Sequence, residues 1–334
     1  MNSRDRILHA LSGDRTDRAA VLCPGGMMSL AVTEVMTAQR AAWPEAHRDE
    51  ETMLRLALGM HEATGFDSVA LPFCMTVEAE AYGAVVDMGD MLTQPRVKQG
   101  ILPADGSGEL PIPDFRAARA GTVLRAMSRA RSARPEAALI GNLVGPISLL
   151  GMLADPLQVL RWTRRQPEVL SRHLDRIAED LIEFGRLQKR AGADAICIAE
   201  PTATGEILGG PQFRSFALPH LNRLAEALRG AGLRIIAHIC GDVRAIRAEL
   251  WDLHADAVSF DSMVDIVTLA GARPPWRVMG NVSAFLLEAG PPEAIGGHCG
   301  GLLKGGVRLL APACGVIPTT PVAHLRAMRD AVPP

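Results

Sequence analysis

Short apolar segments alternate with longer helix-like segments along almost the whole chain, and this alternation restricts the fold more than any other feature. The apolar segments are rich in β-branched residues and end at Gly, Pro or polar residues, as buried strands do. Eight strands are predicted, over residues 19–23, 68–71, 138–144, 194–199, 234–240, 257–260, 277–280 and 307–314. Helices are predicted over residues 3–11, 48–63, 116–132, 156–190, 213–230, 243–250, 264–270, 291–304 and 321–331.

Strands that alternate with helices form a parallel sheet. Eight strand–helix units in a chain of 334 residues predict an α/β fold of one domain. This domain is a single (β/α)8 (TIM) barrel over residues 1–334, with residues 3–11 as an N-terminal helical extension. An open, doubly wound sheet fits less well, because no Gly-x-Gly-x-x-Gly turn follows the first strand. Residues 87–113 carry few periodic signals and are predicted to form a loop or a small excursion.

The composition and charge argue against several classes of partner. A formal net charge of −2 gives no sign of a nucleic-acid-binding surface. The sequence has no run of about 18 apolar residues, so no transmembrane helix is expected. The N-terminal residues are charged and no apolar run follows them, so no signal peptide is expected. Six cysteines scattered through the chain favour a reducing compartment over a disulfide framework. We therefore expect a cytoplasmic protein with no nucleic-acid or membrane partner.

Polar and metal-binding side chains recur where the predicted strands end. In a (β/α)8 barrel the carboxyl ends of the strands carry the active site. Buried polar side chains at that end need a partner or a function. The residues found there are Cys74, Asn142, Glu200, His238, Cys240, Asp261, Asn281 and Cys314. The sequence therefore predicts a functional site at this end of the barrel.

Three of these residues form a candidate metal site. His238 and Cys240 are two residues apart on one strand, so their side chains point to the same face. Cys314, at the end of another strand, would add a third ligand and leave one coordination position open. An imidazole and two thiolates around an open position are typical of a catalytic zinc site. The alternative is a buried histidine with two small apolar cysteines.

The other strand-end residues are candidates for supporting roles. Glu200 and Asp261 are predicted catalytic residues, as acids beside the metal or as replaceable ligands, although a carboxylate at such a place often caps a helix or forms a salt bridge. Glu78 is a predicted substrate-binding residue, and a solvated helix face is its alternative. Asn142 and Asn281 are predicted to bind substrate through their amides.

Segments spread over nearly the whole chain resemble the uroporphyrinogen decarboxylase superfamily, and more closely its zinc-dependent branch, the methylcobalamin:coenzyme M methyltransferases. The resemblance is carried by residues 4–18, 72–83, 200–205 (Glu-Pro-Thr-Ala-Thr-Gly), 238–241 (His-Ile-Cys-Gly), 279–282 (Met-Gly-Asn-Val) and 311–315 (Ala-Pro-Ala-Cys-Gly). In this branch the His-x-Cys motif and a late cysteine bind zinc. The resemblance therefore implies that His238, Cys240 and Cys314 are the zinc ligands.

The resemblance also implies an activity and its partners. The cofactor would be zinc (Zn2+), and methylcobalamin, a methylated corrinoid presented by a separate corrinoid protein, would be the methyl donor. The acceptor would be a small thiol such as coenzyme M, with homocysteine and tetrahydrofolate as alternatives. A homodimer is common in this superfamily. A metal-free, decarboxylase-like lyase and a non-catalytic barrel that binds a corrinoid or a partner protein are the alternative functions.

Two departures from the family pattern bear on these expectations. Glu200 stands where the family often has an aspartate, which changes the reach of the carboxylate by one methylene. The decarboxylase branch has an arginine-rich motif after its first strand, which grips substrate carboxylates. Residues 23–28 of this chain read Cys-Pro-Gly-Gly-Met-Met and contain no arginine. This difference argues against decarboxylation of a polyanionic tetrapyrrole.

Overall fold

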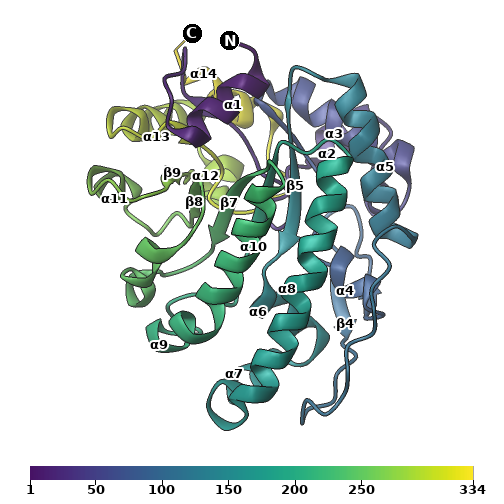
Figure 1. Cartoon of the computed structure of the whole chain (residues 1–334). Coiled ribbons are helices and arrows are strands. Elements are labelled where there is room, and N and C mark those ends of the chain that lie inside the picture. The colour runs from purple at the N-terminus through teal and green to yellow at the C-terminus, as the bar shows by residue number, and fades with distance from the viewer. Residues whose placement is uncertain (334) are drawn as a thin grey trace.

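The computed structural model of the chain describes residues 1–333, and in it eight parallel strands form a nearly closed barrel (Figure 1). Their order around the barrel is β1-β10-β9-β8-β7-β6-β5-β2. The strands are β1 (Ala20–Val21), β2 (Ser68–Ala70), β5 (Ala138–Val144), β6 (Ala195–Ala199), β7 (Arg234–Ile239), β8 (Ala257–Phe260), β9 (Arg277–Met279) and β10 (Leu309–Leu310). The predicted barrel is confirmed, and each predicted strand overlaps an observed one.

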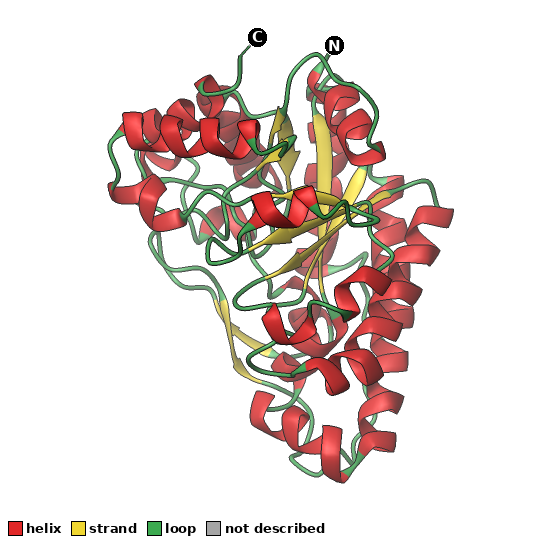
Figure 2. Cartoon of the chain, turned by 90° about the vertical axis from the view of Figure 1, so that its left-hand side faces the viewer, coloured by secondary structure: helices red, strands yellow, loops and turns green. Residues whose placement is uncertain are grey.

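Helices surround the barrel on the outside, as Figure 2 shows. They are α1 (Ser3–Ser12), α2 (Thr33–Ala38), α3 (Glu50–Thr64), α4 (Val77–Ala81), α5 (Ala118–Ala133), α6 (Pro146–Leu153), α7 (Pro156–Arg165), α8 (Pro167–Arg190), α9 (Gly210–Gln212), α10 (Leu218–Gly230), α11 (Ile266–Gly271), α12 (Ala284–Ala289), α13 (Pro292–Lys304) and α14 (Val322–Asp330). The predicted N-terminal extension is α1, which packs against β1, β2, β5 and β10. Within residues 1–333, no helix is long and apolar enough to cross a bilayer.

Several predicted elements differ in detail. The helix predicted over residues 156–190 is two helices, α7 and α8, because Pro167 has no N–H and forces Gln166 out of the helical conformation. The helix predicted over 243–250 was wrong, since two short 3-10 turns, η3 (Arg244–Ile246) and η4 (Glu249–Asp252), stand there. Part of the predicted excursion forms an antiparallel pair, β3 (Val85–Asp87) and β4 (Arg96–Gln99). Two further turns are η1 (Glu45–His47) and the π-helical η2 (Phe213–Ala217).

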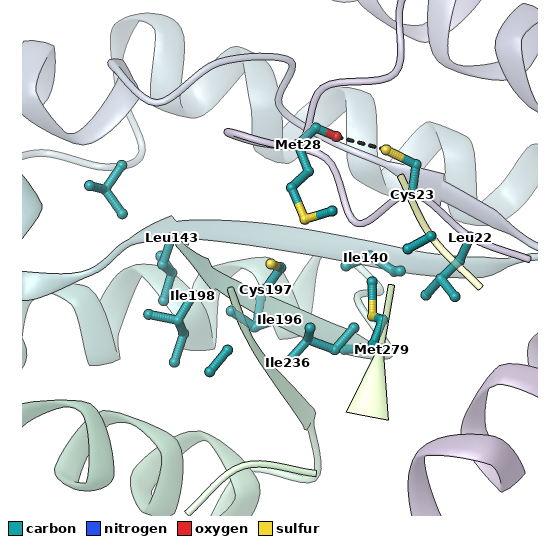
Figure 3. Close-up of a cluster of buried hydrophobic side chains, with 14 of the residues drawn as sticks. Leu22, Cys23, Met28, Ile140, Leu143, Ile196, Cys197, Ile198, Ile236 and Met279 are labelled. Atoms are coloured by element: carbon teal, nitrogen blue, oxygen red, sulfur yellow. Dashed lines mark hydrogen bonds between the residues drawn. The ribbon is translucent and has the colours of Figure 1, made fainter. Parts of the chain in front are cut away.

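Apolar side chains fill the barrel, and sulfur-containing residues take part in this core. Figure 3 shows Cys23 and Met28 together with Cys197 and Met279 and with isoleucines of β5, β6 and β7. The thiol of Cys23 donates a hydrogen bond to the carbonyl of Met28 at 2.7 Å. A barrel filled in this way is a packed core rather than a pore, so a functional site must lie at one end of the strands.

An aspartate precedes each of three strands at the amino end of the barrel. Asp67 precedes β2, Asp194 precedes β6 and Asp256 precedes β8. The carboxylate of each one accepts a hydrogen bond from a backbone N–H of the neighbouring strand, at 2.7 to 3.0 Å. The donors are Val21, Leu139 and Ile235. Each carboxylate also pairs with two arginines, so its charge is compensated.

Asp67 bridges β1 and β2, the two strands at the ends of the hydrogen-bonded order. Its N–H donates to the carbonyl of Val21 at 2.7 Å, and its Oδ2 accepts from the N–H of Val21 at 2.9 Å. Arg6 and Arg18 lie 2.7 and 2.9 Å from Oδ1 of the same fully buried carboxylate. The ion pairs therefore allow a charge to be buried at the seam where the barrel closes.

Removing the charge of Asp67 should lower the stability of the protein strongly. Asp67→Asn keeps the size of the side chain but leaves Arg6 and Arg18 beside a neutral amide, so we expect the free energy of unfolding to fall by about 3–5 kcal/mol. Urea unfolding followed by circular dichroism measures the change. Asp330→Asn, at an exposed carboxylate of α14, is the control and should change stability by no more than about 0.5 kcal/mol. A loss at Asp67 no larger than in the control would contradict this role.

Candidate metal centre at the carboxyl end of the barrel

The three predicted metal ligands come together at the carboxyl end of the barrel. His238 belongs to β7, Cys240 follows that strand, and Cys314 follows β10, three strands away around the barrel. The ligand atoms of the three residues all lie within 4.8 Å of one another. The two sulfur atoms are 4.0 Å apart. Residues 74 positions apart in the chain thus form one compact donor set, as the sequence predicts.

The imidazole of His238 is fully buried and fixed on one side only. Its Nδ1 lies 3.1 Å from the hydroxyl oxygen of Ser259, which is its register partner on β8. The same hydroxyl lies 3.5 Å from Sδ of Met28, to which it donates its own proton. Ser259 therefore accepts from Nδ1–H, and the lone pair of His238 is on Nε2. Among the described residues, this buried Nε2 has no hydrogen-bond partner.

The two thiols of the centre shift each other's pKa in opposite directions. A hydrogen bond from Cys240 lowers the pKa of Cys314, which burial opposes and the imidazole of His238 assists. The same hydrogen bond, together with burial, raises the pKa of Cys240. The pair therefore reaches the state of one thiol and one thiolate readily. Both residues are partly exposed, whereas Cys23, Cys74, Cys197 and Cys299 are buried.

Asp261 lies beside the donor set. Its Oδ2 is 3.2 Å from the sulfur of Cys240 and 3.4 Å from the N–H of Gly241, and its Oδ1 accepts from the N–H of Met263 at 3.1 Å. Burial acts to raise the pKa of Asp261, but these hydrogen bonds outweigh it and leave the pKa below the usual value. An ionised carboxylate therefore stands next to the two sulfurs.

Asn281 holds the loop that carries Asp261. Its buried side-chain amide donates to the carbonyl of Asp261 at 2.7 Å and to that of Val264 at 2.8 Å. Both protons of the amide group are used in this way. The contact places Asn281 close to the centre, with its nitrogen engaged by the backbone rather than directed at a ligand.

Glu200 is buried at the end of β6, and its carboxylate faces the start of α6. The two oxygens accept from the N–H groups of Ile147 and Ser148 at 3.0 and 2.8 Å, and the hydroxyl of Ser148 also donates to the carboxylate. Burial raises the pKa of Glu200 to about 7, although these hydrogen bonds act to lower it. Its own N–H donates to the carbonyl of His238 at 2.9 Å. Glu200 thus joins the backbone of the centre to α6.

Glu78 and Asn142 lie around the end of β5. Glu78 is buried in α4 and accepts from the N–H of Val144 at 2.9 Å, and burial raises its pKa to about 7. The amide of Asn142 donates to the carbonyls of Pro24 and Leu71 at 2.7 and 3.1 Å. These bonds tie the ends of β1 and β2 to β5. The solvated helix face considered for Glu78 does not occur, since this side chain is buried.

Cys74 belongs to a separate cluster. Its sulfur accepts from Nη1 of the buried Arg119 at 3.1 Å, and the same guanidinium donates to Thr76 at 2.9 Å and pairs with Glu80. This cluster holds the loop after β2. Sequence reasoning named Cys74 but missed Arg119, because a single arginine in a helix gives no sign that it is buried.

Ser259 is the other residue that sequence reasoning missed. Its hydroxyl contacts the imidazole of His238, yet Ser259 lies inside β8 rather than at the strand end, where the predicted site residues lie. One signal was available, since Ser259 is the sole polar residue of the β8 segment Ala-Val-Ser-Phe. A buried hydroxyl in a central strand needs a hydrogen-bond partner, which the neighbouring strand must supply.

A cavity of about 490 Å³ lies among the segments that follow β7 and β8. Asp242 and Met263, two residues beyond Cys240 and Asp261, lie at one side of it. Leu250, Trp251, Leu269 and Trp276 make much of its wall apolar. None of the three candidate ligands lines this cavity, so it is distinct from the donor set.

Comparison with known proteins gives matches over nearly the whole chain. The methylcobamide:CoM methyltransferase MtaA of Methanosarcina barkeri (strain Fusaro / DSM 804) is 30% identical over 332 residues, which cover 97% of this chain and 96% of that protein. A solved structure described as a methyltransferase from Methanosarcina mazei superposes with a TM-score of 0.93 at 30% identity, covering 99% of this chain and 98% of the other. A uroporphyrinogen decarboxylase of Edwardsiella ictaluri (strain 93-146) is 28% identical over 240 residues, covering 67% of this chain and 66% of that protein.

The family assignment follows from the extent of these matches. Residues 2–333 match the profile of the family described as uroporphyrinogen decarboxylase (URO-D). The match includes every strand of the barrel and all three residues of the donor set. The chain therefore belongs to the uroporphyrinogen decarboxylase (URO-D) family.

Proposed function

We propose that this protein is a zinc-dependent methyltransferase that moves a methyl group from a methylated corrinoid to the sulfur of a small thiol, with coenzyme M as the first candidate acceptor. The observation that carries the proposal is the donor set of His238, Cys240 and Cys314, in which the buried Nε2 of the histidine has no hydrogen-bond partner among the described residues. Relatives named as methylcobamide:CoM methyltransferases, which match 97% of this chain, support the same activity.

The donor set fits zinc better than the other common metal ions. Two sulfurs and one imidazole nitrogen suit zinc, whereas magnesium and calcium prefer oxygen ligands. The buried Nε2 has the lone pair that a metal requires, because Ser259 fixes the other ring nitrogen. A bound zinc ion would hold a substrate thiol in its open position and favour the thiolate form of that sulfur.

The reaction balances without any further reactant. The thiolate sulfur attacks the methyl carbon, a carbon–sulfur bond forms, and the carbon–cobalt bond breaks. Cobalt keeps the electron pair of the broken bond, so methylcob(III)amide becomes cob(I)amide, and the proton of the thiol passes to solvent. The thiolates of Cys240 and Cys314 would offset the charge of a bound zinc ion, which would leave nucleophilic character on the substrate sulfur.

We propose two kinds of role for the neighbouring residues. Asp261 would fill the fourth position of the centre until a substrate thiol replaces it, since its carboxylate lies 3.2 Å from the sulfur of Cys240. Glu200 and Glu78 would fix the backbone at the end of β5 and the start of α6, through the N–H groups that they bind. Asn142 and Asn281 would border the substrate while fixing the loops that carry the site.

The corrinoid is proposed to arrive on a separate protein. The barrel and its helices take up the residues that the structure describes, and the donor set lies at the open end of the strands. A large flat ligand held by a carrier can meet a sulfur there. The 28% identical decarboxylase suggests decarboxylation as the alternative activity. The absence of arginine from residues 23–28 disfavours this alternative, because a substrate with many carboxylates would need cations there. Homocysteine and tetrahydrofolate are the acceptors to compare with coenzyme M.

Removal of either cysteine ligand should abolish the centre. Cys240→Ser and Cys314→Ser replace a thiolate with a weak ligand, so we expect zinc to fall from about one per chain to near none. Methyl transfer from methylcobalamin to coenzyme M should fall by more than the ~100-fold typical of losing an outer partner of a ligand. Metal analysis and a thiol-consumption assay measure the two effects.

Cys299→Ala is the control for this pair, because Cys299 is a buried cysteine of α13 away from the centre. It should keep both zinc and activity. Full zinc content with full activity in Cys314→Ser would contradict the ligand assignment. Zinc bound to the wild type without any methyl transfer to a series of thiols would instead contradict the activity.

Ser259→Ala tests the support of the histidine. Without the hydroxyl, Nδ1–H of His238 loses its acceptor and the ring loses its fixed tautomer, so zinc affinity should fall about 10- to 100-fold. Competition with a coloured chelator measures this affinity. Ser128→Ala, at an exposed serine of α5, is the matched control. Equal affinities in the two variants would rule out a role for Ser259.

Asp261→Asn tests the proposed replaceable ligand. An amide binds zinc more weakly than a carboxylate, so a thiol should compete for the fourth position more easily. We expect a lower KM for coenzyme M together with zinc affinity reduced about tenfold. Steady-state kinetics at varied coenzyme M, with zinc in excess, separates the two effects. An unchanged KM and an unchanged zinc affinity would show that Asp261 stays outside the coordination sphere.

A further inference from the structure

A second cavity, of about 800 Å³, lies at the amino end of the barrel, opposite the metal centre. It is bordered by the residues that follow α1 and by those at the start of β9 and β10. Four arginines line it, namely Arg15, Arg273, Arg277 and Arg308. One carboxylate, that of Asp14, lies in the same wall. Nothing in the proposed methyl transfer uses this cavity.

These four arginines differ from the others at this end of the barrel. Those around Asp67, Asp194 and Asp256 are each paired with a carboxylate, as described above. None of the four in the cavity has a carboxylate within 4.0 Å among residues 1–333, and Asp14 forms no ion pair with them. An excess of three positive charges is therefore gathered around one concavity and is not compensated by the chain itself.

The guanidinium of Arg277 packs against the backbone at the end of α1. A Cβ atom at Gly13 would lie 2.6 Å from Cζ of Arg277, so the guanidinium rests directly on this glycine. Gly13 ends α1 with a φ of 82°, a conformation that other residues rarely adopt. Arg308 is anchored in another way, because its Nη1 donates to the carbonyl of Leu303 at 3.3 Å. Two of the four exposed guanidiniums thus have a contact with the backbone at the edge of the cavity.

We propose that this cavity binds a small anion that carries two or three linked phosphoryl groups. A guanidinium presents paired N–H donors that match phosphate oxygens, and it stays charged at any physiological pH. A single phosphate group carries about two negative charges, which is fewer than the four arginines supply. A volume of about 800 Å³ falls within the range of about 300–1,000 Å³ found for small-molecule sites. A diphosphate or triphosphate group meets both requirements.

Two sources share this chemistry, an inorganic polyphosphate and a nucleotide, and the experiment separates them. Isothermal titration calorimetry would be run on the zinc-loaded protein with inorganic tripolyphosphate and, separately, with ATP. We expect saturable binding of tripolyphosphate with one site per chain. Tighter binding of ATP would assign the site to a nucleotide, and equal or weaker binding would assign it to the phosphate chain alone.

The arginines are tested by a double variant, Arg277→Ala with Arg308→Ala. Loss of two charge-assisted contacts should weaken tripolyphosphate binding about 100-fold or more. Both side chains are exposed, so the variant should keep its circular dichroism spectrum and its methyl transfer activity. Arg186→Ala is the control, because it also removes the positive charge of an exposed arginine. Arg186 belongs to α8 and does not line the cavity.

Phosphate oxygens also bind zinc, so binding of tripolyphosphate at the metal centre has to be distinguished from binding at the arginines. Cys240→Ser, which removes a zinc ligand, makes this distinction. This variant should bind tripolyphosphate as the wild type does, whatever its zinc content or activity. The proposal is overturned if neither probe binds saturably to the wild type at about 0.1 M salt. It is also overturned if the double variant binds as tightly as Arg186→Ala, or if binding disappears in Cys240→Ser.

Discussion

The closing of the barrel between β1 and β2 is the constraint on which the rest of this molecule depends. These strands are short, and the backbone N–H and the side-chain carboxylate of Asp67, both bonded to Val21, take the place of a longer ladder between them. β1 in turn pairs with β10, which leads to Cys314. β10 is joined to β7 through β9 and β8, and closure at the seam fixes the curvature that makes the ends of β10 and β7 face each other. The donor set is therefore a consequence of closure, because its two halves come from different parts of the circle.

The two ends of the barrel differ in whether their buried polar groups have partners within the chain. At the amino end, three buried carboxylates are each satisfied by a backbone N–H and two arginines. At the carboxyl end, the Nε2 of His238 is buried with no partner in the described chain. Leaving such a group unpaired costs about 1–3 kcal/mol. The fold carries this cost at the place where a ligand would remove it, which is typical of a binding centre rather than a structural core.

The barrel and the donor set were predictable from sequence because both depend on local patterns. Eight apolar runs bounded by turns indicate strands, and a spacing of two residues puts His238 and Cys240 on one face. Contacts between distant segments gave no such signal. The carboxylate of Glu200 is directed at the N-terminus of α6, and the guanidinium of Arg119 reaches the thiol of Cys74. The predicted catalytic role of Glu200 and the predicted substrate contacts of Asn142 and Asn281 stay predictions, since these side chains also hold backbone.

The uneven exposure of the six cysteines gives the centre a chemical identity of its own. Four of the thiols are packed inside the molecule, and Cys240 and Cys314 alone reach solvent. A thiolate reacts with electrophiles far faster than a thiol does, and the hydrogen bond from Cys240 lowers the pKa of Cys314. An alkylating reagent added to the folded chain would therefore modify the centre first. Occupancy of the site by any metal would be readable as protection from that modification, without a catalytic assay.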